Sequence, residues 1–321
     1  MRSTSVRALA LAGAVVMLVG ACTGGTAATA SPAATASPAT ASTASVAPTD
    51  TSSPAASASA AVSPSTPASA AALTAPARIA SAGKLVFCSD ISYAPEEFYA
   101  KDGTTAQGSD IDIANAIGKA WGVTVEIDNT GFDSIILALG AKKCDLVISG
   151  MNDTADRQKQ VDFVDYLKVG QGLLVPAGNP KGIHTLDDLS GKSVAVQLGT
   201  TNLDALNAKN VELKAAGKPA INIQGFKQDN LAFAQLGLGR VDAYSTDSPV
   251  VAYYNSLPEN AGKYEIGGTP IAPAVIGIAM RKDDTGMKAA VQAAIDAMYA
   301  DGSLKSIMDK WGMTNAVVFL K

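Results

Sequence analysis

Three polar positions in the chain carry groups that could hold a small charged molecule. Arg157 stands in the stretch VISGMNDTADRQKQVDF, after a strand-like apolar run that ends at small residues. Gly199, Thr200 and Thr201 lie between an expected strand and an expected helix, where backbone N–H groups and the helix dipole attract an anion. Asp247 ends another expected strand. Together these positions offer complementary charges and hydrogen-bond donors.

Each of these groups also has a simpler local explanation. Arg157 could form a solvated pair with a nearby carboxylate, namely Asp153, Asp156 or Asp162. Thr201 or Asn202 could cap the helix that follows, and Asp247 could cap a helix that begins at Ser-Pro. The local sequence leaves both interpretations open.

Several other chemistries lack the residues they need. The chain has no phosphate-binding loop, no G-x-G-x-x-G opening a helix after the first strand, and no G-x-S-x-G nucleophile turn. His184 is the sole histidine and has no second nitrogen ligand for a metal and no nearby catalytic serine motif. A net charge of −4 disfavours nucleic acid as a partner. We therefore expect no metal, no cofactor, no nucleic acid and no catalytic residue.

The first 76 residues differ in composition from the rest. Residues 1–21 contain two arginines followed by an apolar run, which is typical of a secretory signal peptide. The sequence VGAC that ends at Cys22 resembles the lipobox of bacterial lipoproteins, in which the cysteine is lipidated; the alternative is an ordinary signal peptide with an incidental cysteine. Residues 22–76 are mostly Ala, Ser, Thr and Pro, which predicts a disordered linker.

Short apolar runs alternate with helical patterns in the remaining chain. Strands are expected at 84–89, 123–128 and 144–150, with helices at 109–122 and 132–143 between them. A second series has strands at 192–199, 220–226 and 241–247 with helices at 202–217 and 230–239. This alternation predicts α/β architecture with parallel sheets covered by helices, in two lobes. After a strand at 276–282, two helices at 287–302 and 304–312 complete the packing.

Three helical patterns predict buried faces, formed by Ile113, Ile117 and Trp121; by Phe132, Ile135, Ile136 and Leu139; and by Val291, Ile295 and Met298. Cys88 lies near the end of one strand and Cys144 just before another. These cysteines could pair in an oxidising compartment. A parallel arrangement, however, would put them at opposite strand ends, too far apart for a disulfide, so we favour free cysteines.

Five fragments in order resemble one protein family. They are CSDISYAPEEFYAKDGTTAQGSDIDIANAI, FDSIILALGAKKCDLVISGMNDTADRQKQVDF, LDDLSGKSVAVQLGTT, LGRVDAYSTDSPVVAYY and YADGSLKSIMDKWG. The chain thereby resembles, from about Lys84 to Gly312, the family 3 solute-binding proteins that serve polar amino acid ABC importers. The resemblance implies a two-lobed periplasmic-binding-protein type II fold, each lobe a mostly parallel sheet flanked by helices, joined by two hinge strands. The lobes would comprise 77–168 with 276–321, and 173–268.

The resemblance also implies a site for an L-amino acid between the lobes. Arg157 matches the arginine that holds the ligand α-carboxylate, and Thr201 the threonine that completes this carboxylate site from the opposite lobe. Asp247 matches the aspartate that pairs with the α-ammonium. The other matching positions are Ser149 with the adjacent Gly150 and Asn152 at the α-groups, Asp90 and Tyr93 in the side-chain pocket, Phe132 as an aromatic wall, and Gln197, where family members vary with specificity.

Three positions depart from the family pattern. Glu96 replaces an apolar residue, Asn152 stands where a hydroxyl is common, and Ser109 replaces a common aromatic. Glu96 with Asp90 could bind a cationic side chain such as that of arginine or lysine, or Glu96 could point to solvent.

The resemblance implies a monomeric bacterial receptor, anchored by lipid outside the cytoplasmic membrane, that delivers a polar amino acid to the transmembrane subunits of an ABC permease. An enzyme on the same fold, like the cyclohexadienyl dehydratases, and a ligand-sensing lipoprotein are the alternatives.

Overall fold

The computed structural model describes residues 73–313. The expected signal peptide, Cys22 and nearly all of the expected linker lie outside these residues. The linker's last part is described, and there Leu73 and Ala75 pack against a hydrophobic core. No helix within 73–313 is both long enough and apolar enough to cross a membrane.

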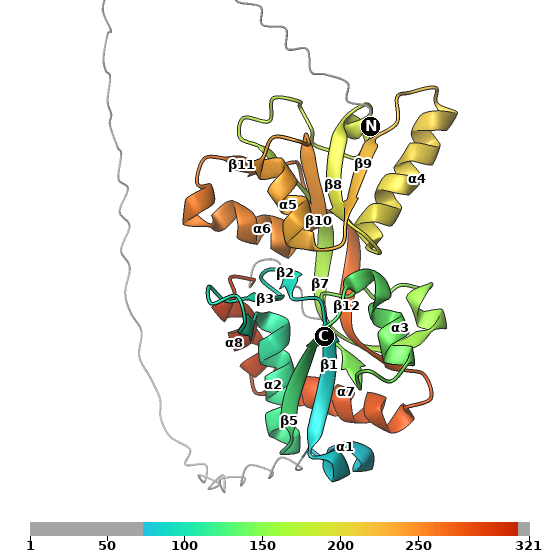
Figure 1. Cartoon of the computed structure of the whole chain (residues 1–321), viewed down its shortest axis with the longest axis vertical. Helices are drawn as coiled ribbons and strands as arrows, with labels where there is room; N and C mark the ends of the chain where they lie inside the picture. The colour runs from blue at the N-terminus through green and yellow to red at the C-terminus, as the bar shows by residue number, and fades with distance from the viewer. Residues whose placement is uncertain (1–72, 314–321) are drawn as a thin grey trace, which may run out of the picture. The chain divides into compact units, whose positions relative to one another are not determined.

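A sheet of nine strands runs through the described chain (Figure 1). Its order is β5-β1-β6-β12-β7-β10-β8-β9, with β11 paired to β7. The strands are β1 (Lys84–Ser89), β5 (Thr124–Asn129), β6 (Leu146–Val147), β7 (Val161–Pro176), β8 (Ser193–Gln197), β9 (Asn222–Phe226), β10 (Ala243–Asp247), β11 (Tyr264–Ile266) and β12 (Ile271–Arg281).

The sheet belongs to two lobes, and the long antiparallel strands β7 and β12 run from one lobe to the other (Figure 1). Lobe 1 contains β1, β5, β6, the first part of β7 and the last part of β12. Lobe 2 contains β8 to β11 and the last part of β7. β1 pairs with β5 and β6 in parallel, and β8 pairs with β9 and β10 in parallel. The predicted fold class is therefore confirmed, including the two strands that connect the lobes.

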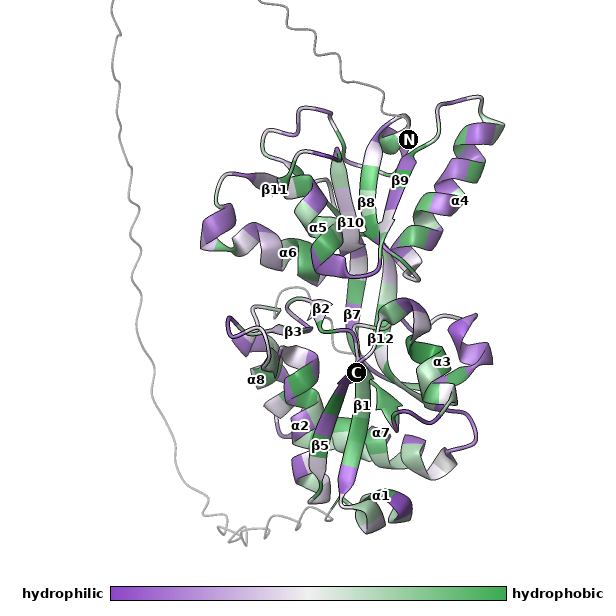
Figure 2. Cartoon of the chain, viewed as in Figure 1, coloured by the Kyte–Doolittle hydropathy of each residue, from purple (hydrophilic) through white to green (hydrophobic). Residues whose placement is uncertain are grey.

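Helices cover both faces of the sheet in each lobe. Those of lobe 1 are α1 (Ala77–Ala82), α2 (Ser109–Trp121), η1 (Phe132–Ser134), α3 (Ile135–Gly140), η2 (Arg157–Lys159), α7 (Thr285–Ala300) and α8 (Ser303–Lys310). Those of lobe 2 are η3 (Asp187–Leu189), α4 (Thr201–Ala215), α5 (Asp229–Gly237), α6 (Ser248–Ser256) and η4 (Pro258–Asn260). Figure 2 shows hydrophobic residues along β1 and β7 and more hydrophilic ones along the edge strand β9.

Alternation along β1 explains the two cores of lobe 1, because successive side chains of a strand point to opposite faces. Leu85 and Phe87 belong to the core that α2, α7 and α8 cover, whereas Cys88 belongs to the core under α3. The predicted apolar faces of α2 and α7 are buried, as are Ile135 and Leu139 of α3. Phe132 and Ile136 are partly buried against the same cluster, so the predicted helix faces are confirmed.

Cys88 and Cys144 form a disulfide, which corrects the prediction from the sequence. Their Cα atoms are 5.6 Å apart, within the usual range for a disulfide. The prediction placed Cys144 just before a strand, at the end opposite to Cys88, but β6 has only two residues, Leu146 and Val147, and Val147 lies opposite Cys88. Cys144 instead lies in the connection after α3 and packs in the core under that helix, so the spacing along the strands does not set its distance from Cys88.

A small second sheet, which the sequence did not predict, lies beside the start of lobe 1. It consists of β2 (Ser92–Tyr93), β3 (Glu97–Tyr99) and β4 (Ala106–Gln107). In this antiparallel sheet Tyr93 lies opposite Glu97. The register therefore decides which of two adjacent glutamates, Glu96 or Glu97, pairs with Tyr93 across this sheet.

Candidate ligand-binding site

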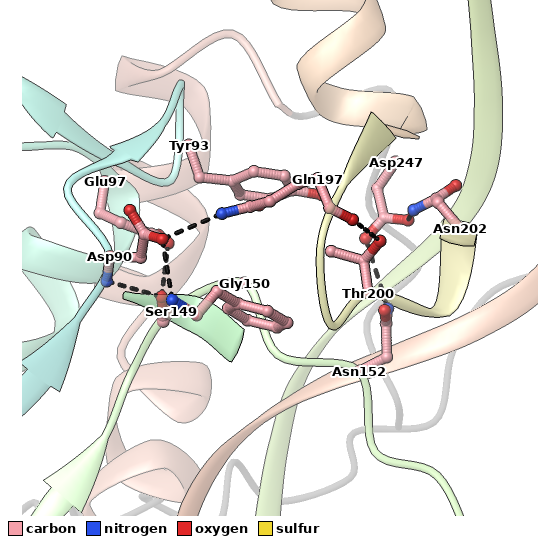
Figure 3. A pocket seen from close by; sticks show the side chains of 11 residues that line it. Asp90, Tyr93, Glu97, Ser149, Gly150, Asn152, Gln197, Thr200, Asn202 and Asp247 are labelled. Carbon is pink, nitrogen blue, oxygen red and sulfur yellow. Dashed lines mark hydrogen bonds between the residues drawn. The ribbon is translucent and has the colours of Figure 1, made fainter. Parts of the chain in front are cut away.

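A cavity lies between the lobes, where strands of both lobes end (Figure 3). Ligands of open α/β sheets bind outside the carboxyl ends of the strands, and β1, β6, β8 and β10 all lead into this cavity. Its lining residues are Asp90, Tyr93, Glu97, Phe132, Ser149, Gly150 and Asn152 of lobe 1, and Gln197, Thr200, Asn202 and Asp247 of lobe 2.

The structure brings together most of the residues predicted for the site. Eight of them line the cavity: Asp90, Tyr93, Phe132, Ser149, Gly150, Asn152, Gln197 and Asp247. Arg157 and Thr201 do not line the cavity, but each donates a hydrogen bond to Asn152, which does. Glu96 does not line it.

Arg157 connects the two lobes through its guanidinium group. One nitrogen donates to the carbonyl of Asn152 in lobe 1, at 2.8 Å, and another to the carbonyl of Gly199 in lobe 2, at 3.0 Å. The guanidinium carbon lies 5.3 Å from the ring centroid of Phe132, a cation–π distance. Burial lowers the pKa of Arg157, and Asp204 and Asp247 oppose this effect. An arginine nevertheless stays protonated, so Arg157 places a positive charge at the edge of the cavity.

Arg157 does not form the ion pair with a neighbouring aspartate that the local sequence allowed. Asp156 pairs with Lys159, and Asp162 pairs with Lys282. Asp153 accepts a hydrogen bond from Gln158. The arginine therefore turns toward the cleft rather than toward the surface carboxylates next to it in sequence.

Asp247 is held by amides from both lobes. Its carboxylate accepts from Asn202 Nδ2 at 2.9 Å and from Asn152 Nδ2 at 3.4 Å. It occupies the N-cap position of α6, yet its side chain forms no capping bond there. Burial raises the pKa of Asp247, while these amides and Arg157 act in the opposite direction. The carboxylate is thus directed into the cavity instead of serving the helix.

Thr201 contributes to the contact between the lobes, and Thr200 caps the helix. Thr201 Oγ1 donates to Asn152 Oδ1 at 2.7 Å. Thr200 Oγ1 accepts from the backbone N–H of Leu203 at 3.2 Å, which makes it the N-cap of α4. The sequence had offered Thr201 or Asn202 as the cap, and this is corrected by one residue. The sequence also missed Thr200 and Asn202 as lining residues, because their places depend on where α4 begins.

Asp90 is the most fully bonded carboxylate of the site. It accepts from Ser92 Oγ at 2.7 Å, from the Phe132 backbone N–H at 2.9 Å and from Gln197 Nε2 at 2.9 Å. Gln197 belongs to lobe 2 and also donates to the carbonyl of Lys227. Burial raises the pKa of Asp90, and the three donors oppose that rise. The bond between Gln197 and Asp90 crosses the cavity (Figure 3).

Glu97, rather than Glu96, is the glutamate of the cavity. Glu97 Oε1 accepts from Ser149 Oγ at 2.9 Å, and burial followed by the charge of Asp110 raises its pKa well above the usual value. Glu96 is completely buried, so it points neither into the cavity nor to solvent. The sequence could not separate the two glutamates, because the direction of each side chain depends on the pairing of β2 with β3, in which Glu97 is the partner of Tyr93.

The cavity is small as packed. Its volume is about 10 Å³, which is roughly enough for one water molecule. Five side chains of lobe 1 form hydrogen bonds with lobe 2, namely Asp90, Ser92, Tyr93, Asn152 and Arg157. An amino acid can enter only if these contacts between the lobes open. Within the described residues, no group of three or more His, Cys, Asp or Glu side chains is placed to hold a metal ion.

Residues 85–314 match the model of the bacterial extracellular solute-binding proteins, family 3. The chain belongs to this family. Among its curated relatives, the L-cystine-binding protein TcyJ of Escherichia coli is 28% identical over 73% of this chain and 84% of its own length. The arginine-binding extracellular protein ArtP of Bacillus subtilis is 30% identical over 71% and 86%. The histidine-binding periplasmic protein of Escherichia coli is 31% identical over 70% and 85%.

Solved structures of the family share this two-lobed fold. An ancestral arginine-binding protein bound to arginine is 38% identical and superposes with a TM-score of 0.65, covering 71% of this chain and 98% of its own. An ancestral amino acid-binding protein, a precursor of cyclohexadienyl dehydratase, is 35% identical with a TM-score of 0.66, covering 73% and 97%. The chain is thus a member of an amino acid-binding family whose relatives bind different amino acids.

Proposed function

We propose that the protein captures an amino acid with a cationic side chain, such as arginine or lysine, by closure of its two lobes. Three acidic residues line the cavity, Asp90, Glu97 and Asp247, and no lining residue is a cation. The pKa of Glu97 is raised well above its usual value, which favours its neutral form, whereas donors oppose the rise at Asp90 and Asp247. One carboxylate suffices for an α-ammonium group, so the other favours a second positive charge. This excess of carboxylates is the observation that carries the choice of ligand.

We assign the individual residues the roles that the family resemblance implies. Arg157 offers a planar donor fork that matches the α-carboxylate of the ligand, and Thr201 reaches the same end from lobe 2. Asp247 pairs with the α-ammonium group. Asp90, with Tyr93 and Phe132 as walls, receives the cationic side chain and exchanges its bond from Gln197 for one from the ligand. Since these groups come from both lobes, the bound ligand holds the lobes shut.

The cellular setting of this proposal rests on the family and on the N-terminal sequence. After removal of residues 1–21, a lipid on Cys22 would anchor the monomer outside the bacterial cytoplasmic membrane, and residues 22–76 would tether the binding domain. The closed receptor would then deliver its ligand to the permease subunits of an ABC importer. An arginine-binding extracellular relative and a histidine-binding periplasmic relative support the role of a receptor outside the cytoplasm.

Removing the guanidinium group tests the site. We expect Arg157→Ala to weaken binding of L-arginine by at least about 100-fold in calorimetry, because two or more charge-assisted bonds are lost. The exposed Arg240 provides the matched control, and Arg240→Ala should bind as the wild type does. Near wild-type affinity of a folded Arg157→Ala chain would refute the assignment. A thermal-shift screen against the twenty amino acids identifies the ligand independently.

An enzyme remains a second candidate because one structural relative is a precursor of cyclohexadienyl dehydratase. That reaction would need a carboxyl group in the pocket as general acid or base. Glu96, the residue considered for this role from the sequence, does not line the cavity, whereas Glu97 does. We favour binding over catalysis because Arg157 and Asp247 together suit the two charges of an α-amino acid. Turnover of prephenate or arogenate by the purified chain would reverse this preference.

A further inference from the structure

The carboxyl group of Glu96 is buried without a hydrogen-bond partner on any other described residue. The residue is 0% exposed, and only its own backbone N–H acts as a donor that opposes the rise in its pKa. Its backbone carbonyl accepts from the N–H of Asp110. Buried polar groups are nearly always satisfied, because an unpaired one costs free energy, so two orphaned oxygens on one side chain call for an explanation.

Groups from both lobes face Glu96, and those that carry charge are acidic. From lobe 1 these are Asp110 of α2, Glu97 of β3, Tyr93 of β2 and Tyr166 of β7; from lobe 2 they are Asp229 of α5, Asp247 of β10 and Tyr254 of α6. The lobes touch at this place, since the backbone N–H of Asp229 donates to Ser92 Oγ at 3.1 Å. Lobe closure therefore brings Asp229 and Asp247 toward Glu96.

An ionised Glu96 would be an unpaired charge among like charges at a position shielded from solvent, which is strongly unfavourable. Burial, followed by the charges of Asp110, Asp247 and Asp229, raises the pKa of Glu96 well above 4.5. Burial also raises the pKa of Asp229 on the opposite lobe, to about 8. Opening of the lobes would remove the lobe 2 carboxylates and admit water, which lowers the pKa of Glu96 again.

We propose that Glu96 is a proton-binding site coupled to lobe closure: the closed form holds a proton on this carboxyl group, and loss of the proton opens the cleft. The closed form binds more protons than the open form. Its stabilisation is therefore complete at pH values below the pKa of Glu96 in the open form and is lost as the pH rises toward the pKa in the closed form. The proposal rests on the proposed hinge closure but not on the identity of the ligand.

Hydrogen–deuterium exchange of the full chain without added ligand tests this directly. The peptides that cover 90–98 and 229–236 report the contact between the lobes. After correction for intrinsic exchange rates, we expect wild-type exchange in both peptides to accelerate as the pH rises from about 5 to about 9, as proton linkage requires. Glu96→Gln should lose most of that acceleration. The matched control is Glu126→Gln, an exposed glutamate of the same lobe, which should follow the wild type.

The outcomes separate this proposal from the proposed function. Equal pH profiles for the wild type and Glu96→Gln would overturn proton coupling. Glu96→Leu, which also cannot ionise, must match Glu96→Gln and decides the question if the glutamine variant fails to fold. Calorimetry with L-arginine adds a second readout, in which wild-type affinity falls with rising pH by up to about tenfold per pH unit and that of Glu96→Gln falls less. If L-arginine does not bind at all, the choice of ligand fails while the exchange experiment still decides the role of Glu96.

Discussion

Two regions of the interface between the lobes treat a buried carboxyl group in opposite ways. In the region around Asp90, the carboxylate accepts three hydrogen bonds, one of them from Gln197 of the other lobe. In the region around Glu96, six residues further along, the carboxyl group accepts none from any other described residue. Both side chains are almost fully buried.

This contrast shows that burial alone does not decide the charge of an acid. Donors around Asp90 oppose the rise in its pKa, so a negative charge can be kept there for a cationic ligand. Around Glu96 the neighbouring charges are acidic and reinforce the rise in pKa that desolvation causes, so the neutral acid is favoured. One region is suited to attract a ligand, and the other is suited to respond to pH.

Removal of the disulfide should have the largest effect on stability. It tests how far the region around Asp90 depends on the bond between Cys88 and Cys144. Cys88 precedes Asp90 by two residues, and the bond to Cys144 closes a separation of 56 residues. We expect replacement of both cysteines by serine to lower the free energy of unfolding by about 4 kcal/mol, as chain entropy predicts for a loop of this length. Urea unfolding measures the loss.

If the variant with both cysteines replaced by serine still folds, the pH dependence of exchange in the Glu96 region should be unchanged. The reason is that Glu96 lies outside the core that contains the disulfide. Loss of the response together with the disulfide would mean that the two regions form one unit. An unchanged unfolding free energy would indicate that the native chain does not depend on the bond.

Asp90→Asn provides the direct counterpart of Glu96→Gln, since both replace a carboxyl group by an amide. Ser92 donates to Oδ1 of Asp90, while Phe132 and Gln197 both donate to Oδ2. An amide N–H₂ would replace one of these two acceptor oxygens, and the remaining donors would lose the negative charge of their acceptor. We expect binding of L-arginine to weaken by about 10-fold to 100-fold, corresponding to one lost charge-assisted bond. Calorimetry at constant pH measures the change. Equal effects of the two amide substitutions would abolish the distinction between the regions.

The smallest effect concerns the two adjacent threonines at the start of α4. Thr200→Ala removes the N-cap bond to Leu203 and should lower the free energy of unfolding by about 1 kcal/mol. Thr201→Ala leaves that bond intact and removes only the contact with Asn152 across the lobes. Thermal unfolding of the two variants measures both losses of stability. A larger loss for Thr201→Ala than for Thr200→Ala would contradict the assignment of Thr200 as the stabilising N-cap of α4.

Local patterns were sufficient for much of the fold and for part of the candidate site. The spacing of Ile113, Ile117 and Trp121 predicted the buried face of α2, because helical periodicity is a property of neighbouring residues. Asp90 and Asp247 could be proposed because both follow the ends of strands expected to be parallel, and such ends meet at one edge of a sheet.

The amino-acid sequence by itself determined the two-lobed α/β architecture and the presence of an arginine and several carboxylates at the strand ends. Only the tertiary structure decided which of two neighbours fills each role. It places Glu97 rather than Glu96 in the cavity, Thr200 rather than Thr201 at the cap, and Cys144 in a bond with Cys88. The physical reason is that a helix or strand period arises from neighbouring residues, whereas a shift of one residue in register, or the path of a turn, depends on contacts with distant segments.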